Sequence, residues 1–287
     1  MEQLKSGYTA ELEVLEQDGS RWILNGDGVQ EHIMLNASDA DENIQEGDIV
    51  NVFLYMNRRG ELSATMQLPN MTAETFGWGR VIRVDDHEGV FVDIGSSIEV
   101  LVNKNDMPKV RALWPKIDDA LYMTLRMDLG GTIFGRLATE ERVLEQIVEA
   151  PTTVFNMDLK ARAYRLLPVG SFMLSVPENY RIFIHNTEQE REPRLGQEMN
   201  VRIIGVRDDG TLNGSMLPRK EERQGDDAEK LLRHLNEVGG RMPFTDKSTP
   251  DEIKEMFNLS KASFKRALGK LMKEGRIEQS EGWTLLK

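Results

Sequence analysis

The chain has 287 residues, a formal net charge of −12 and no cysteine. This length allows two to four compact domains, and the lack of cysteine excludes disulfides, thiolate zinc sites and cysteine nucleophiles. No apolar stretch approaches the length of a membrane span, and the first residues lack the pattern of a secretion signal, so we expect a cytoplasmic protein.

The negative charge is unevenly distributed. Residues 1–68 carry 4 basic and 13 acidic side chains, whereas residues 219–287 carry 15 and 13. Contacts to phosphate groups need Lys and Arg. Repulsion of nucleic acid should therefore be strongest at the N-terminus and weakest at the C-terminus.

One seven-residue ending occurs three times: a turn glycine, then an alternating apolar and polar segment with small residues near its end. Each copy is typical of a strand that leaves a hairpin, and recurrence about every 70 to 80 residues favours three small β domains. The copies are Gly60–Met66, Gly131–Leu137 and Gly210–Met216.

Five short strands are predicted in each of three units, residues 1–68, 69–138 and 139–218, and a closed barrel would remove the exposed edges of so small a sheet. In the third unit a helix over 139–150 precedes the strands, with Thr139 as N-cap, and we interpret it as a packing spacer. The expected strands are 8–14, 21–24, 32–35, 49–54 and 60–66; 76–84, 89–95, 98–102, 121–125 and 131–137; and 159–167, 170–174, 180–185, 199–204 and 210–216.

The spacing within the units supports the repeat. Asn36 lies 11 residues before Gly47, and His185 lies 11 residues before Gly196. Asn103 fills the same slot in the middle unit, ahead of a longer loop. We therefore expect these three side chains at one equivalent position.

The predicted secondary structure changes from mainly β to mainly helical in residues 219–287. A charged linker from Pro218 to Arg223 is followed by three amphipathic helices, the second opened by a capping box at Thr249-Pro250-Asp251-Glu252. Two strands, 276–279 and 283–286, then form a hairpin, so this region predicts a winged helix-turn-helix. The expected apolar faces are Leu231, Leu232, Leu235 and Val238; Ile253, Met256 and Phe257; and Phe264, Leu268, Leu271 and Met272.

Common catalytic signatures are absent: the sequence has no phosphate-loop, zinc-helix or nucleophile-elbow motif, and its four histidines show no ligand spacing. The acidic pairs at Asp85, Asp118 and Asp208 are interpreted as turn residues. We expect neither an enzyme nor a bound metal or cofactor.

Nucleic-acid binding is the function with positive features. Strands 2 and 3 of a small barrel present a shallow face on which bases stack on aromatic rings. Period-two strands bury half of their side chains, so the core is the competing interpretation for each ring. The barrel candidates are Trp22, Phe91, Asn103, Lys104, Phe172, Phe183 and His185.

The third helix of the last unit is basic, as expected of a recognition helix that contacts phosphates. A solvated face used for protein contacts is the alternative. The basic residues are Lys261, Lys265, Arg266, Lys270 and Lys273.

Two strand motifs carry a family resemblance. Gly89–Gly95 resembles the GAFVDIG strand of S1-type RNA-binding domains, which are OB-fold barrels, and Phe183–Glu188 resembles their LVHxSE strand. Three such units and a winged helix, together with the segment 165–172, resemble the conserved virulence factor B family of bacterial RNA-binding regulators. The fold class is thus multidomain and mainly β: three tandem five-stranded OB-fold barrels and an α+β winged helix.

The resemblance implies RNA binding and post-transcriptional control, including virulence traits, without catalysis. It carries the second aromatic of the RNA face onto Phe91 and Phe172, and the histidine onto His185. There are departures from the pattern: Glu88 and Val169 fill the first aromatic slot, and Asn36 and Asn103 the histidine slot. With its acidic charge, unit one is the unit whose RNA binding is most in question.

Three hypotheses follow. The chain binds single-stranded RNA through units two and three with help from the winged helix; or it is a duplex-DNA regulator led by the winged helix; or it is a protein-interaction scaffold.

Overall fold

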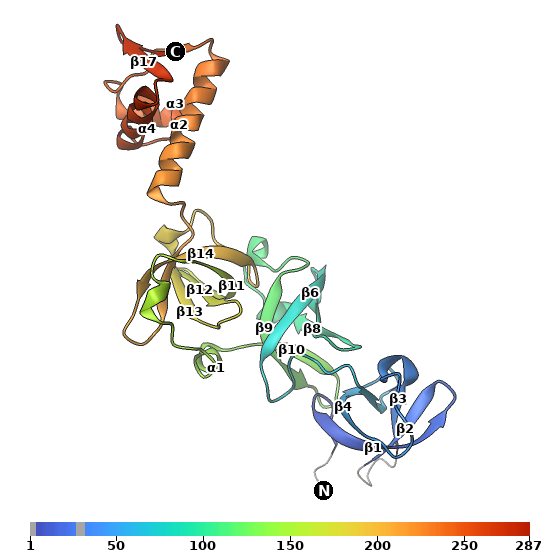
Figure 1. The fold of residues 1–287 in the computed structure, drawn as a ribbon. Coiled ribbons are helices and arrows are strands. Elements are labelled where there is room, and N and C mark those ends of the chain that lie inside the picture. Colours follow the sequence, from blue (N-terminus) through green and yellow to red (C-terminus); the bar gives the residue numbers. More distant parts are fainter. Residues whose placement is uncertain (1–3, 27–31) are drawn as a thin grey trace. The chain divides into compact units, whose positions relative to one another are not determined.

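The structure is a computed structural model that describes residues 4–26 and 32–287. It divides into two compact units, Met1–Met216 and Leu217–Lys287 (Figure 1). The first holds three barrels in a row, and the second is a small helical domain with a three-stranded sheet. The fold class predicted from the sequence, three five-stranded barrels and a winged helix, is confirmed.

Each barrel is a closed five-stranded sheet with the same strand order, in which the fifth strand lies between the third and the fourth. The third and fifth strands pair in parallel, and the other neighbours are antiparallel. All fifteen strands occur where the sequence predicts them, with ends that differ by a few residues. Barrel one comprises β1 (Thr9–Asp18), β2 (Arg21–Asn25), β3 (His32–Asn36), β4 (Ile49–Met56) and β5 (Leu62–Thr65).

The other two barrels repeat this arrangement. Barrel two comprises β6 (Gly77–Asp85), β7 (Gly89–Asp93), β8 (Glu99–Asn103), β9 (Ala120–Met127) and β10 (Ile133–Leu137). Barrel three comprises β11 (Asp158–Leu167), β12 (Gly170–Ser175), β13 (Arg181–His185), β14 (Glu198–Val206) and β15 (Leu212–Ser215).

The repeated ending supplies a small residue where each barrel closes. Ala64, Gly135 and Gly214 occupy the same position in the three endings, and all are buried. A Cβ atom on Gly214 would lie 2.4 Å from Cγ1 of Val201 and 2.8 Å from Cγ2 of Ile182. The ending therefore has an architectural role, because a larger side chain would collide with branched core residues there.

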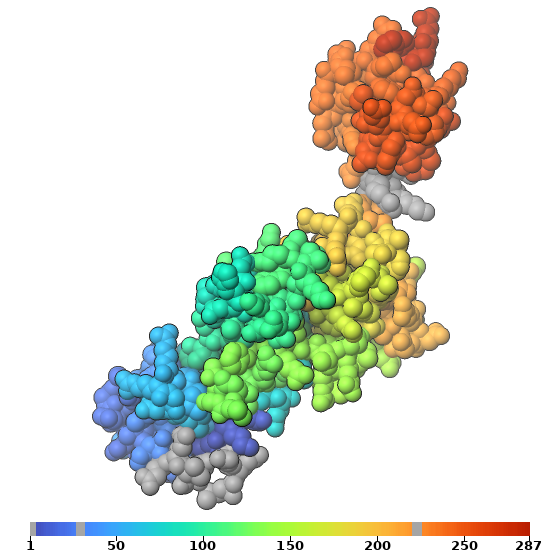
Figure 2. Space-filling model, turned by 180° about the vertical axis from the view of Figure 1, so that it is seen from behind, coloured from blue at the N-terminus to red at the C-terminus, as the bar shows by residue number. Residues whose placement is uncertain are grey.

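Barrel two contacts both of its neighbours, which flank it in the space-filling view (Figure 2). Phe53 of barrel one is fully buried in the core cluster of barrel two. On the other side, Arg194 of barrel three donates two hydrogen bonds to Asp119 of barrel two, at 2.9 and 3.0 Å. Two backbone bonds, from Ala120 to Gly196 and from Leu195 to Leu113, join the same barrels.

The helix between barrels two and three is shorter than predicted. The helix α1 spans Glu140–Leu144, not residues 139–150, and Thr139 lies at its N-cap without a side-chain cap bond. Only Val143 of the helix is fully buried, whereas Leu144 and Val148 are exposed. The residues after Leu144 bury too little apolar surface to stabilise further turns of the helix.

The second unit confirms the winged helix and its capping box. The side chain of Thr249 accepts a bond from the backbone N–H of Glu252, whose carboxylate accepts one from the backbone N–H of Thr249. A short strand that the sequence did not predict, β16, pairs with the second strand of the wing. The elements are α2 (Lys220–Glu237), β16 (Arg241–Met242), α3 (Pro250–Phe257), α4 (Lys261–Lys273), β17 (Ile277–Ser280) and β18 (Trp283–Leu286).

Four details of the prediction for this unit were wrong. The charged run expected as a linker is helical from Lys220 onward, because α2 begins there. Val238, Met256 and Met272 were assigned to apolar faces, yet all three are exposed. The remaining predicted residues all belong to the core of this unit, and Leu231, Leu235, Ile253, Phe264 and Leu268 among them are at most 1% exposed.

We predict that Gly214→Ala destabilises the first unit by about 1–3 kcal/mol, since overpacking a closed core costs that much. Gly205→Ala in the same barrel is the matched control. Its added Cβ would come no closer than 3.4 Å, to a side-chain atom of Asn213, so it should be neutral or stabilise by up to about 1 kcal/mol. Urea unfolding of both variants, followed by circular dichroism, checks this. Equal midpoints would contradict the role of Gly214 in barrel closure.

Candidate nucleic-acid interface

Strand pairing makes the three barrels directly comparable. The last residue of each third strand pairs with the first residue of the second strand and is followed by one turn of 3-10 helix. This confirms the predicted common slot. The equivalent pairs are Asn36 with Arg21, Asn103 with Gly89, and His185 with Gly170.

A second set of equivalent positions lies two residues after the first residue of each second strand. There, three neighbouring side chains, one each from strands 1, 2 and 3, form a row on the outer face. The third-strand member of the barrel-three row, Phe183, lies between Ile182 and Ile184, both fully buried, and so points outward. The rows are Glu16–Ile23–Met34, Arg83–Phe91–Leu101 and Arg165–Phe172–Phe183.

Barrel three concentrates aromatic rings on this face. The ring centroids of Phe172 and Phe183 are 4.9 Å apart, and the His185 ring meets Phe183 edge-on at 6.4 Å. The guanidinium carbon of Arg181 lies 4.4 Å from the centroid of Phe172. Two partly exposed rings, a cation and an exposed histidine thus form one continuous patch, and all three predicted residues of barrel three belong to it.

The hydrogen bonds around His185 favour one tautomer. Nδ1 of His185 accepts a bond from the backbone N–H of Thr187 at 3.3 Å and lies 2.8 Å from its hydroxyl. With Nδ1 acting as acceptor, the neutral ring carries its proton on Nε2. His185 therefore presents an exposed N–H donor beside the two rings.

Barrel two has a poorer version of the same face. The guanidinium of Arg83 covers the ring of Phe91 at 3.4 Å and forms an ion pair with Glu99 at 3.5 Å. The side chain of Asn103 accepts from the backbone N–H of Asn105, and Lys104 beside it is exposed. The structure thus places Phe91 at the middle of β7, and Asn103 and Lys104 at the end of β8, with a single ring on this face.

In barrel one the predicted ring lies elsewhere. Trp22 pairs with the fully buried Leu35 and packs against the core of barrel one, so it does not occupy the slot of Phe91 and Phe172. That slot holds Ile23, and Glu16 stands where the other barrels have arginine. The outer row of barrel one therefore has neither a ring nor a cation.

Sequence reasoning missed the arginines of this face. Arg83 and Arg165 pair with Phe91 and Phe172 only because each first strand has a β-bulge just before the arginine, which shifts the alternation by one residue. An alignment of the three first strands would have placed them opposite Glu16. Arg181 lies on the third strand, β13, and no feature of the sequence pointed to it.

Three of the basic residues of α4 are exposed and two are partly exposed, whereas Phe264, Leu268 and Leu271 are buried. Lys265 is 3.9 Å from Asp246 and Lys270 is 4.0 Å from Glu274, both weak surface pairs. Arg266 donates to the hydroxyl of Ser263. The predicted set is Lys261, Lys265, Arg266, Lys270 and Lys273.

Two of the three acidic pairs supply turn residues, Asp85 and Asp209. Asp85 accepts backbone N–H bonds from Glu88 and His87, which hold its pKa below the ordinary value. Hydrogen bonds from the hydroxyl and N–H of Thr211 do the same for the pKa of Asp209. Across residues 4–26 and 32–287, no group of three His, Asp or Glu side chains could hold a metal ion. No helix in this part of the chain is long and apolar enough to cross a membrane.

Family models match the chain over most of its length. Residues 6–67 match an S1 domain, and residues 76–136 match the first S1-like domain of CvfB. Residues 144–218 match the second domain of the virulence regulatory factor CvfB, and residues 229–286 match the CvfB-like winged helix domain.

Comparisons with whole proteins lead to the same family as the family models. The chain is 47% identical to conserved virulence factor B of Staphylococcus epidermidis, over 94% of this chain and 91% of that protein. It is 39% identical to the Bacillus subtilis protein YitL, over 99% and 94%. A crystal structure of a multidomain protein with nucleic acid binding domains from Streptococcus pneumoniae superposes with a TM-score of 0.68 at 36% identity, covering 98% of both chains. The chain belongs to the conserved virulence factor B family.

Proposed function

We propose that this protein binds single-stranded RNA through the outer faces of barrels two and three, with the winged helix adding affinity. It would act in the cytoplasm as a non-catalytic, post-transcriptional regulator of gene expression, including virulence traits. We assign these roles to residues 69–138, 139–218 and 219–287, and give residues 1–68 no part in binding.

The observation that carries the proposal is the patch on barrel three. Phe172 and Phe183 offer partly exposed rings for bases, and Nε2 of His185 offers a donor. Arg181 and Arg165, both paired with Glu140 in this structure, place two cations beside the rings. Stacking of a base on an aromatic side chain is worth about 1–3 kcal/mol, so a few rings can bind a strand in a chain of net charge −12. Barrel two adds Phe91 under Arg83.

A single strand suits this face better than a duplex. The rings lie on the shallow sheet of a small barrel, where bases must be splayed out of a helix to stack. The Streptococcus pneumoniae relative, described as having nucleic acid binding domains, supports the nucleic acid partner, and the S1 models support RNA.

A second candidate function is duplex-DNA binding led by the winged helix. The observation that favours it is the basic outer side of α4, since a recognition helix of this kind enters a groove. Titration of the full chain with single-stranded RNA and with duplex DNA of equal length separates the two. Tighter binding of the duplex would favour this candidate.

We predict that Phe183→Ala combined with His185→Ala raises the Kd for single-stranded RNA about tenfold or more, because one stacking platform and one donor are lost. Phe183 is preferred to Phe172, which also packs against Tyr164 and Leu174. Met34→Ala, the same slot in barrel one, should leave the Kd unchanged. Fluorescence anisotropy with a labelled RNA measures both, and equal effects of the two changes would refute the assignment.

For the winged helix, we predict that changing Lys261, Arg266 and Lys273 to Gln weakens RNA binding. The slope of log K against log salt should become shallower by about 0.7 for each phosphate that the variant no longer neutralises. The control removes the same charge from the exposed Arg233, Lys247 and Lys254. If both triple variants lose the same affinity, α4 has no specific role.

A further inference from the structure

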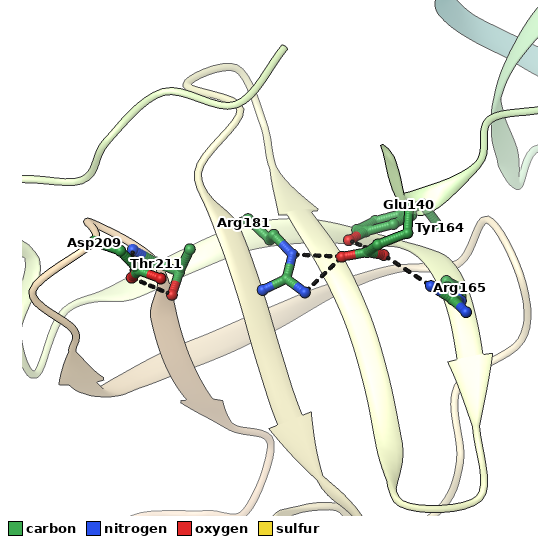
Figure 3. Close-up of polar contacts among 6 residues, drawn as sticks. All are labelled: Glu140, Tyr164, Arg165, Arg181, Asp209 and Thr211. Atoms are coloured by element: carbon green, nitrogen blue, oxygen red, sulfur yellow. Dashed lines mark hydrogen bonds and ion pairs between the residues drawn. The ribbon is translucent and has the colours of Figure 1, made fainter. Parts of the chain in front are cut away.

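One carboxylate, that of Glu140, accepts hydrogen bonds from three side chains of barrel three (Figure 3). Oε1 of Glu140 accepts from Nε of Arg181 at 2.8 Å and from Nη2 at 2.5 Å. Its Oε2 accepts from the hydroxyl of Tyr164 at 3.0 Å and from Nη1 of Arg165 at 3.3 Å. Four donors from three side chains thus surround a single anion.

These donors are the ones that bind phosphate groups in proteins. A guanidinium matches two oxygens of a phosphate as well as it matches a carboxylate, and a tyrosine hydroxyl adds a third donor. Burial and the nearby charge of Glu140 raise the pKa of Tyr164, so its hydroxyl stays protonated and donates. The same pocket would accept a phosphate group.

Arg165 and Arg181 lie beside the candidate RNA face, and Tyr164 is buried next to it, in a cluster against which Phe172 packs. Tyr164 is the extra residue of the β-bulge in β11, and bulges turn a side chain away from the regular alternation. Arg165, next to it, pairs with Phe172, and Arg181 stacks on the ring of Phe172. The anion site and the stacking patch therefore share residues.

The anion comes from outside the barrel. Glu140 is the first residue of α1, in the segment that connects barrels two and three, whereas Arg83 of barrel two pairs with Glu99 of its own sheet. The Glu140 carboxylate can therefore leave the sheet of barrel three while every strand stays paired. Val143, fully buried, keeps α1 in place while the Glu140 side chain turns.

A groove leads to this carboxylate. It has a volume of about 600 Å³, and its lining includes Glu140, Tyr164 and Arg165 together with Pro108 of barrel two and Leu195 of barrel three. An RNA strand can therefore approach the site from between barrels two and three.

We propose that Tyr164, Arg165 and Arg181 form a binding site for a backbone phosphate of RNA, and that the Glu140 carboxylate occupies this site until RNA displaces it. The inference rests on the proposed RNA function and adds its regulation: the protein carries its own competitor for the phosphate.

The test compares full-length variants by anisotropy with a fluorescein-labelled, single-stranded RNA of 15 nucleotides. Glu140→Gln removes the competing charge and keeps the shape, so its Kd should fall roughly 1.5- to fivefold, as expected for pairs between partly exposed charges. Glu141→Gln is the control, since this exposed neighbour has the same charge and makes none of these bonds. In a chain that already has Arg165→Gln, Glu140→Gln should give a smaller gain.

The outcomes separate the two proposals. If the wild type binds the RNA but Glu140→Gln binds no better than Glu141→Gln, the competitor is refuted and the proposed function stands. If no variant binds the RNA, the proposed function falls and the competitor falls with it. Should Glu140→Gln unfold, the wild type decides: the Nε–H resonance of Arg181 must shift when RNA is added, and an unchanged resonance in a chain that binds RNA overturns the proposal.

Discussion

Each barrel closes by pairing its third and fifth strands in parallel, and this closure fixes the register on which the rest of the first unit depends. The fifth strand must pass close to branched core residues, so its middle position holds Ala64, Gly135 or Gly214. Once the register is set, the second strand faces the bulged first strand on one side and the third strand on the other. The outer row of three side chains is a consequence of that geometry.

The three barrels share this backbone arrangement and differ in the side chains on their outer faces. Barrel three presents Phe172 and Phe183 with two arginines, barrel two presents Phe91 under Arg83, and barrel one presents Ile23 beside Glu16. This order agrees with the acidic charge of residues 1–68. Barrel one packs Phe53 into the core of barrel two, so it supports its neighbour structurally. The copies have diverged in surface chemistry while the cores stayed alike.

The sequence predicts the architecture well, because it depends on local signals. Turn glycines, period-two alternation and the capping box at Thr249 are all readable from short segments, and so is the 11-residue spacing that aligns Asn36 with His185. The predicted site was less complete. Trp22, Ile23 and Leu24 are all apolar, so alternation does not tell which face of β2 is buried. Trp22 was therefore kept as a candidate, although Ile23 holds the slot of Phe91 and Phe172.

The remaining misses come from longer-range geometry. A β-bulge leaves no mark in the sequence, yet it places Arg165 opposite Phe172 on the outer face and leaves Tyr164 as the extra residue beside it. Glu140 was interpreted as part of a spacer helix, although its contacts are with residues 24 to 41 positions further along the chain. Such contacts exist only after the barrel has closed.

The central claim is that RNA contacts barrels two and three on the faces of their second and third strands and avoids barrel one. Photo-crosslinking of the full chain to an RNA that contains 4-thiouridine, with peptide mapping by mass spectrometry, tests it directly. We expect crosslinks in residues 162–185 and 83–104, with few in residues 9–36. Crosslinks concentrated in residues 9–36, or none in any barrel, would contradict the claim.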